Sequence, residues 1–459
     1  MKRLVPLVTL MTAACATSPL PPAPAINRDL AAAPFASLPV ATIAPVPDDW
    51  WRLYDDPVLD QLVEASLAAN ADLRVAYANL DGARAALRLS EAARLPQTTI
   101  ESGLGIDNPA NQPSASGNVP TTDYDLAATA SWDADLFGRL RSAALAARAD
   151  ADAQAAAMDG VRVAVVADTV QAYVDLCGAT GGIAMVSEQV RLLERALRIT
   201  NSQLAAGEVS PLEVAQAANL VATTRAAIAP LEAAQANARY RLATLAGRPP
   251  ADARTNPVTC AAPPRLRDAV PVGDGTALLL RRPDVREAER RLVAATARIG
   301  VARADLYPRV NLGGAIGLLS GGLVATASPL VSWSFPNQAP VRAKIAQAEA
   351  TERAAFAAWD VAVLRALREV ETALAAYDAE VRRNRVLIEA RDQGQAYARR
   401  AEARVRLGDA TPLLRIDADR TLAQAQLALA QSELAVAQAQ VALFRALGGG
   451  WRTNKQPLE

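Results

Sequence analysis

Histidine is absent from this chain of 459 residues, and aromatic residues make up only 4% of it. The lack of histidine excludes Ser-His-Asp triads, histidine metal sites and acid–base catalysis by histidine. Neither sign of charge is in excess, because 48 Lys and Arg balance 48 Asp and Glu, so nothing in the charge indicates nucleic-acid binding. No glycine-rich phosphate loop follows a strand pattern, and no metal-ligand cluster is recognisable. We therefore expect no enzyme activity, no cofactor and no metal.

Proline is missing from two long stretches, Leu140 to Leu204 and Val341 to Leu407. Their apolar residues recur at the spacing of laterally packed helices, which predicts two helices, each roughly 100 Å long. The first apolar stripe contains Val163, Val166, Val170, Val174 and Cys177, and the second contains Phe356, Trp359, Val363, Leu367, Val370, Leu374 and Tyr377. We expect the first helix to loosen at Gly178 and Gly181.

Each long stretch ends in a glycine turn and is followed by a shorter helical pattern, which runs to Gly247 in the first half and to Gly448 in the second. Gly207 and Gly408 are separated by the same number of residues as Gly247 and Gly448. The equal spacing predicts a duplicated helical hairpin. A long fibrous coiled coil would explain these stretches equally well.

The N-terminus has the charged and apolar parts of a signal peptide, at residues 1–14. Its last residues, Thr12-Ala13-Ala14, precede Cys15 as small residues precede the lipidated cysteine of a bacterial lipoprotein. We expect lipidation of Cys15, with plain cleavage after the small residues as the alternative. The residues 15–48 that follow are rich in proline and alanine and predict an extended tether.

Alternating patterns interrupt the helical ones twice. In the first half, Pro57 opens a helix with Asp56 as its N-cap, and this helix is expected to run to about Ala93. After Pro96, apolar and polar residues alternate over residues 98–107 and again over 124–133. This pattern predicts a β-hairpin with one apolar face. Tyr124 and Trp132 stand near the ends of that face, as in an interfacial aromatic belt.

The second half repeats the order. Pro283 opens a helix over Asp284–Asp305, which we match to the Pro57 helix. Residues 310–318 then alternate, and a returning strand is expected to carry Val331, Trp333 and Phe335. A single membrane helix over residues 310–340 is the alternative, because no charged residue interrupts them, but glycine and proline argue against it. This hairpin is shorter, so its outer loop should be smaller.

Four strands with an apolar outer face cannot stand open in a bilayer, because their edges would leave backbone groups unpaired in hydrocarbon. Since the smallest usual membrane barrel has eight strands, the chain must oligomerise. The long helices are too polar to cross a membrane and must project into an aqueous compartment. The fold class predicted is mainly α, with a membrane β-barrel and a helical conduit.

Several motifs resemble the TolC-like outer-membrane efflux channels, of the lipoprotein branch called NodT-type. They are Asp49-Trp50-Trp51 with Asp56-Pro57, Ala69-Asn70-Ala71-Asp72-Leu73, Arg281-Arg282-Pro283-Asp284-Val285 with Ala288-Glu289, and Ile299-Gly300-Val301-Ala302 with Tyr307-Pro308. The resemblance implies a homotrimer with a twelve-stranded barrel in the outer membrane and a periplasmic α-barrel. It also implies two partners, a periplasmic adaptor and an inner-membrane pump.

On this plan, residues 49–252 form a first repeat, 253–280 a linker, 281–448 a second repeat and 449–459 a C-terminal tail. In the family the hairpin turns meet the adaptor. The matching residues are Gly207, Val209 and Ser210 in the first turn and Gly408, Ala410 and Thr411 in the second. Helix capping alone explains these residues equally well.

Family channels close at these turns with acidic residues that face the pore. By position after the turn glycines, Glu213 and Asp417 match such gate acids, while Leu414 takes the place of another acid. Arg415 is the nearest basic residue, and Arg415 and Asp419 are expected to form ion pairs across helices. Asp417 as a merely solvated helix charge is the alternative.

Cys177 and Cys260 remain once Cys15 is lipidated, and an even pair in an oxidising periplasm predicts a disulfide, with two separate thiols as the alternative. Three functions stay open at this point. The hairpins and the Trp50-Trp51 region favour the outer-membrane duct of a tripartite efflux system, driven by a pump of the resistance-nodulation-division type. The alternatives are the channel of a type I protein-secretion system and a periplasmic coiled-coil scaffold without a pore.

Overall fold

The computed structural model describes residues 41–42, 44–107, 121–254, 258–266, 269–273, 275–319 and 322–449. The signal peptide, Cys15, most of the tether and nearly all of the C-terminal tail lie outside the described residues. The chain divides into two compact units. In its described parts, the sheet unit comprises residues 78–156 and 285–362, and the hairpin unit comprises the rest.

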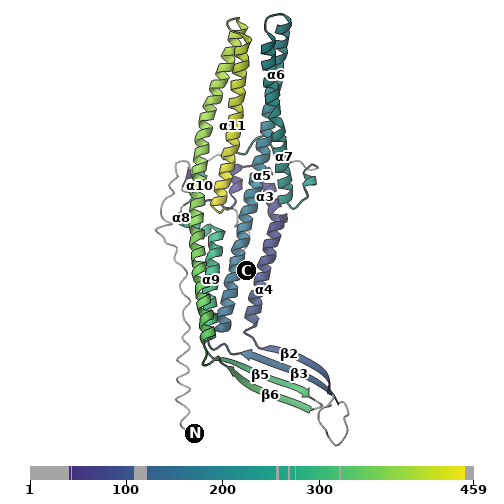
Figure 1. The fold of residues 1–459 in the computed structure, drawn as a ribbon, viewed down its shortest axis with the longest axis vertical. Helices are drawn as coiled ribbons and strands as arrows, with labels where there is room; N and C mark the ends of the chain where they lie inside the picture. The colour runs from purple at the N-terminus through teal and green to yellow at the C-terminus, as the bar shows by residue number, and fades with distance from the viewer. Residues whose placement is uncertain are drawn as a thin grey trace. The chain divides into compact units, whose positions relative to one another are not determined.

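The two long helices agree with the sequence prediction. Helix α5 spans Arg139–Ala205 and α10 spans Ala339–Arg406 (Figure 1). The expected loosening at Gly178 and Gly181 is wrong, because α5 runs through both. These glycines instead allow close packing: a Cβ at Gly178 would lie 2.6 Å from the Leu434 side chain, and one at Gly181 would lie 2.9 Å from the Ala261 carbonyl oxygen.

The two returning helices differ. Helix α11 is continuous over Pro412–Ala446, whereas the first return is divided into α6, Pro211–Ala226, and α7, Ile228–Leu245. The break at Ala227 falls three residues before Pro230. Proline has no N–H to donate to the carbonyl of Ala226, and its ring clashes with that carbonyl in a regular helix.

The Pro57 helix is shorter than expected. Asp56 caps it as predicted, accepting bonds from Val58 N and Leu59 N, but α3 ends at Ala69, and α4 begins again at Ala71 and ends at Ala92. Asn70 causes the break, because its backbone is extended and its side chain caps α4.

The second half has a matching break between α8, Gly275–Arg281, and α9, Pro283–Ala304. Helices α4 and α9 both have 22 residues, and each leads into a strand. The Pro283 helix therefore corresponds to α4, and the expected match to the Pro57 helix is wrong.

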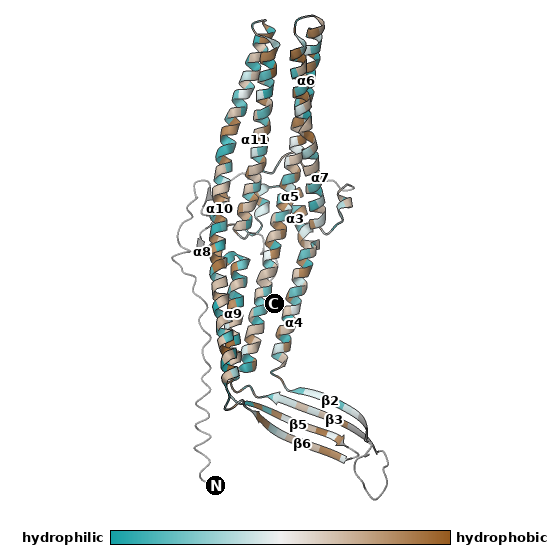
Figure 2. Ribbon diagram, viewed as in Figure 1, coloured by the Kyte–Doolittle hydropathy of each residue, from teal (hydrophilic) through white to brown (hydrophobic). Residues whose placement is uncertain are grey.

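The sheet unit contains one antiparallel sheet in the order β2-β3-β5-β6. Its strands are Gln97–Asp107, Thr121–Asp133, Arg309–Leu319 and Gly322–Ser332. The register pairs Ile100 with Ala128, Ala128 with Ile316 and Ile316 with Ala325, which places these apolar residues on one face as predicted. Figure 2 shows that β5 and β6 carry more hydrophobic residues than β2. The side chain of Tyr124 lies outside the described residues.

The second hairpin excludes a membrane helix over residues 310–340. Residues 320–321 separate its strands, against 108–120 in the first hairpin, so its outer loop is smaller, as expected. Trp333 and Phe335 do not belong to the returning strand, which ends at Ser332. That part of the prediction is wrong, because the chain turns toward α10 after Ser332.

The hairpin unit has a core of apolar side chains from α3, α5, α10 and α11 and from the segment before α3. The fully buried residues include Trp50, Leu59, Val166, Val170, Val174, Leu374, Leu443 and Phe444. The predicted stripe is confirmed in α5. In α10 it fails at Phe356, which belongs to the sheet unit and is 44% exposed. In the described part of the chain, α11 is the one helix long and apolar enough to cross a membrane, yet its C-terminal half lies in this core.

Short elements complete the hairpin unit. The 3-10 helix η2, Trp50–Tyr54, places the Trp50 ring on Phe444, with ring centroids 4.5 Å apart. Strand β1, Ala41–Thr42, pairs in parallel with β4, Val270–Pro271. A second 3-10 helix, η3, spans Pro250–Arg254 after α7.

Candidate functional site at the two hairpin turns

Both turns are built on a glycine in the left-handed conformation. Gly207 and Gly408 each have φ of 75°, and their N–H groups donate to the carbonyls of Leu204 and Val405. The next N–H in each turn donates one residue further back, which completes the glycine cap of a helix. A Cβ at either glycine would meet nothing within 4 Å, so both turns face open space within this chain.

Hydrogen bonds fix the first turn where α6 begins. Ser210 accepts a bond from Leu212 N, while Glu213 accepts a bond from Ser210 N at 3.0 Å, which together form a capping box. The hydroxyl of Ser210 also donates to Glu213. These hydrogen bonds hold the pKa of Glu213 below its usual range. The predicted gate acid Glu213 thus fixes the turn, and its carboxylate is already hydrogen-bonded.

The second turn is fastened differently. Thr411 takes the N-cap position of α11 but makes no side-chain cap bond, and Leu414 stands where a capping box needs an acid. Instead Arg404 reaches across the turn to Asp409, with Nε 2.9 Å from Oδ2. The exposed glycine of each turn is followed by a small, half-buried apolar residue, Val209 or Ala410.

Asp417 lies in the second hairpin between the two helices. The Tyr397 hydroxyl on α10 donates to Asp417 Oδ2 at 3.2 Å, and Arg420 donates to Oδ1 at 2.6 Å. Arg415, predicted as its basic neighbour, instead lies 3.8 Å from Asp419. The expected ion pair across helices is wrong, since Arg415 and Asp419 are one turn apart on α11, where residues four apart share a face.

Asp419 was predicted from the sequence only as an ion-pair partner, and the structure shows that its carboxyl is partly buried. Burial raises the pKa of this carboxyl, Arg415 opposes the rise, and Glu402 on α10 adds to it. The signal for Arg420 is local, since it lies three residues after Asp417 on the same helix, and it was missed. Tyr397 was missed because the register between α10 and α11 requires the structure.

The turns present apolar surface next to these polar groups. Leu407 is 83% exposed, Leu212 is 64% exposed and Leu413 is 43% exposed. Among the described residues, no group of three or more His, Cys, Asp or Glu could hold a metal ion. The arrangement offers exposed backbone and apolar side chains to another protein, and carboxylates beside them.

The predicted cysteine pair lies on α5 and in the linker. Cys177 and Cys260 are joined in a disulfide with their Cα atoms 5.2 Å apart. Cys177 is fully buried, and the bond ties the linker to the core of the hairpin unit.

Known proteins match the chain over most of its length. The family model "Outer membrane efflux protein" matches residues 62–248 and 276–449. Nodulation protein T of Rhizobium leguminosarum bv. trifolii is 28% identical over 88% of this chain and 88% of its own. The toluene efflux pump outer membrane protein TtgC of Pseudomonas putida is 30% identical over 90% of this chain and 87% of its own.

A solved structure agrees. The outer-membrane channel OprN superposes with a TM-score of 0.84 at 34% identity, over 90% of this chain and 94% of its own. The family match covers the long helices, the sheet and both turns. The chain therefore belongs to the outer membrane efflux protein family, as its motifs predicted, and its place is the outer membrane.

Proposed function

We propose that this chain is the outer-membrane duct of a tripartite efflux system, a passive exit for drugs or other small molecules. The observation that carries the proposal is the pairing of an apolar-faced sheet with long helical hairpins in a member of the efflux family. Such a duct needs no catalytic group of its own, because the inner-membrane pump supplies the energy.

Three copies would form the channel. In the described residues, β2 and β6 each pair with one neighbour only, so the sheet has two open edges. Open edges are costly in hydrocarbon, and pairing β6 of one copy with β2 of the next removes them. Three chains of four strands give a twelve-stranded barrel, within the range of outer-membrane barrels.

Each chain is inferred to be a duplicated repeat. The Trp132 indole donates to the Arg94 carbonyl at 2.9 Å, and the Trp333 indole donates to the Leu306 carbonyl at 3.0 Å. Arg94 and Leu306, which precede the two hairpins, are the same number of residues apart as Asn70 and Arg282. Trp132 and Trp333, at the ends of the two hairpins, are the same number of residues apart as Gly207 and Gly408. Equal spacing of equal contacts supports a common origin for both halves.

The turns would contact the periplasmic adaptor through Gly207, Val209 and Ser210 in the first repeat and Gly408, Ala410 and Thr411 in the second. A photo-crosslinking residue at Val209 or Ala410 should capture the adaptor in cells. The same residue at the exposed Arg84 on α4 serves as the control. Capture of the adaptor at Arg84 but at neither turn would contradict this contact.

The gate is assigned to Asp417 and, with its capping role, Glu213. Three copies of a carboxylate around a narrow opening favour cations. Asp417→Asn should lower cation selectivity and weaken block by divalent ions in single-channel recordings, and Glu213→Gln should act in the same direction. If the double variant leaves selectivity and block unchanged, both acids are only helix charges.

The lipid anchor at Cys15 remains a prediction from the sequence. Cys15→Ser should abolish acyl labelling while the protein still reaches the outer membrane. Labelling that persists in this variant would show that the anchor lies elsewhere.

The efflux role itself is tested by complementation. A strain with an intact adaptor and pump but no outer-membrane channel accumulates a fluorescent efflux substrate. Expression of this chain in that strain should restore low accumulation of the fluorescent substrate. Normal assembly in the outer membrane without any change in accumulation would contradict the proposal.

A further inference from the structure

A band of exposed aromatic side chains lies at the end of the sheet where the strands join the helices. The register places Gln97 beside Ser131 and Arg309 beside Ser332, so all four junctions share this end. The band comprises Trp132, Phe137, Tyr307, Trp333 and Phe335, which are between 38% and 67% exposed. Two pairs within it are stacked, Phe137 on Tyr307 and Trp333 on Phe335, each with ring centroids 4.6 Å apart.

The two indoles of the aromatic band are fixed in place. Each donates its N–H to the last residues before a strand, Trp132 to the Arg94 carbonyl and Trp333 to the Leu306 carbonyl. Their apolar faces remain exposed beside the apolar face of the sheet. Tryptophan and tyrosine in such a position lie at the headgroup level of a bilayer.

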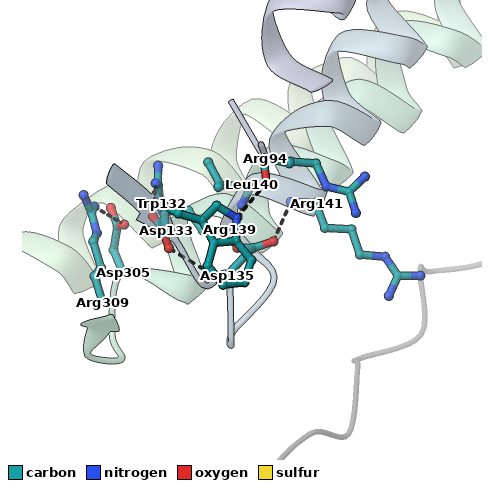
Figure 3. Close-up of polar contacts among 9 residues, drawn as sticks. All are labelled: Arg94, Trp132, Asp133, Asp135, Arg139, Leu140, Arg141, Asp305 and Arg309. Carbon is teal, nitrogen blue, oxygen red and sulfur yellow. Dashed lines mark hydrogen bonds and ion pairs between the residues drawn. The ribbon is translucent and has the colours of Figure 1, made fainter. Parts of the chain in front are cut away.

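Arginines of two kinds surround the first tryptophan (Figure 3). Arg139 and Arg309 are neutralised by Asp133 and Asp305, at 2.7 Å and 2.6 Å. Asp135 accepts the backbone N–H groups of Leu140 and Arg141, so it caps α5.

Arg94 and Arg141 are different. Both are exposed, and in the part of the chain that the structure describes neither side chain forms an ion pair, not even Arg94 with Glu91 on the preceding turn. Figure 3 shows both guanidinium groups on one side of the junction, away from the Arg309–Asp305 pair.

The second repeat carries the same feature. Arg342 follows Trp333 along the chain as Arg141 follows Trp132, and Lys344 lies two residues further on. Both are exposed and form no ion pair with any residue of the described ranges. Each half of the chain therefore carries unpaired positive charge a few residues after a fixed tryptophan.

We propose that Arg94, Arg141 and Arg342, with the aromatic band, bind the phosphate of anionic phospholipid in the periplasmic leaflet of the outer membrane. This rests on the proposed function, since it requires the sheet to cross that membrane. A guanidinium binds phosphate oxygens through two parallel hydrogen bonds, while the adjacent rings pack on the glycerol and upper acyl chain. The unpaired charges complement an anionic headgroup, and the paired ones do not.

The test is native mass spectrometry of the full-length protein in detergent, titrated with dioleoyl-phosphatidylglycerol or with dioleoyl-phosphatidylcholine. Wild type should bind phosphatidylglycerol with clear preference. The triple variant Arg94→Gln, Arg141→Gln, Arg342→Gln should lose at least about fivefold in apparent affinity for phosphatidylglycerol, with phosphatidylcholine unchanged, since basic residues near an anionic surface attract the headgroup. The corresponding triple change to lysine should retain most of the preference.

The matched control removes three exposed arginines from the hairpin unit, Arg198→Gln, Arg399→Gln and Arg400→Gln, and should bind phosphatidylglycerol like wild type. A wild type without preference for phosphatidylglycerol overturns the proposal, whether or not the triple glutamine variant folds well. A folded triple glutamine variant that keeps the preference also overturns it. The same spectra report assembly: failure of wild type to form any oligomer speaks against the proposed channel, whereas intact oligomers without lipid preference speak against this site alone.

Discussion

The side-chain amide of Asn70 donates a hydrogen bond to the backbone carbonyl of Leu245, with Nδ2 3.0 Å from the oxygen, although 175 residues separate them. The same side chain accepts bonds from Asp72 N and Leu73 N, so it starts α4 and receives the end of α7 at once. Asn70 is only 4% exposed. One residue thus joins the entry to the sheet unit with the return of the first hairpin.

Arg282 makes a comparable contact in the second half of the chain. Its Nη1 donates to the carbonyl of Ala446 at 2.8 Å, and Asp284 and Glu369 neutralise its charge. Leu245 and Ala446 are separated along the chain as the turn glycines are. An amide in the first half of the chain and a paired guanidinium in the second therefore each anchor the end of a returning helix.

Asn70→Ala should lower the thermal unfolding midpoint of the purified protein. It removes a helix cap and a part-buried hydrogen bond, which together cost about 1–3 kcal/mol of unfolding free energy. Asn70→Ser can keep the helix cap without reaching Leu245, so its unfolding midpoint should lie between those of wild type and Asn70→Ala. Asn219→Ala, at an exposed position on α6, is the control, and an equal midpoint for both alanine variants would contradict the anchoring role.

Gly247 and Gly207 offer a matched comparison. Both have positive φ, 68° and 75°, so alanine is strained at either, by about 1–2 kcal/mol. Only at Gly247 does a Cβ collide with backbone, 2.4 Å from the Ala69 carbonyl oxygen. Gly247→Ala should therefore reduce stability clearly more than Gly207→Ala in thermal unfolding. Equal losses would show that the close approach at Gly247 relaxes without cost.

The helices and strands could be predicted because their signals are local. Period and proline position determined α5, α10 and the strands to within a few residues. The break at Asn70 was missed because an N-cap residue inside an apolar periodic pattern is not distinguishable from a helical polar residue until its partner at Leu245 is known. The break before Pro230 could have been predicted from the sequence, because proline disrupts the helix hydrogen bond to the residue four positions before it.

The site could be predicted only in part. The turn glycines could be predicted, because a long helix commonly ends at a glycine in the left-handed conformation. Arg420 lies three residues after Asp417 on the same helix, so this partner could be predicted locally, whereas Tyr397 depends on the register between α10 and α11, which no local pattern fixes. The free arginines at the strand junctions were not predicted, because pairing with Asp133 or Asp305 is decided by side-chain geometry in three dimensions.

The disulfide should be found in the protein as it is made in the periplasm. Mass mapping without reductant should recover a linked peptide pair containing Cys177 and Cys260. Because the bond closes a loop over a sequence separation of 83 residues, its loss in Cys260→Ser should cost about 4.5 kcal/mol in the chain-entropy relation. Two free thiols after oxidising extraction would reject the bond.

Asp419 should make stability depend on pH. Burial raises the pKa of its carboxyl, so the folded chain holds the proton more tightly than the unfolded chain. Its stabilising contribution is complete below the ordinary aspartate pKa of about 3.9 and is lost as pH rises through the raised value. Asp419→Asn should thus unfold at a higher temperature than wild type at pH 7, with little difference at pH 4.

The control for this pH effect is Glu208→Gln, an exposed acid in the first turn without an ion pair in the described chain. Its unfolding midpoint should follow wild type at both pH values. An Asp419→Asn protein that is less stable than wild type at pH 7 would mean that the contact with Arg415 outweighs the cost of burial.

The central claim is that the sheets of three copies of this chain close into one barrel. The most direct measurement is native mass spectrometry of the protein extracted in detergent from outer membranes, with circular dichroism to verify that the strands are intact. The account predicts one dominant species of three chains. A stable monomer that retains its strands would contradict it, because a four-stranded sheet with two open edges could then persist without closing into a barrel.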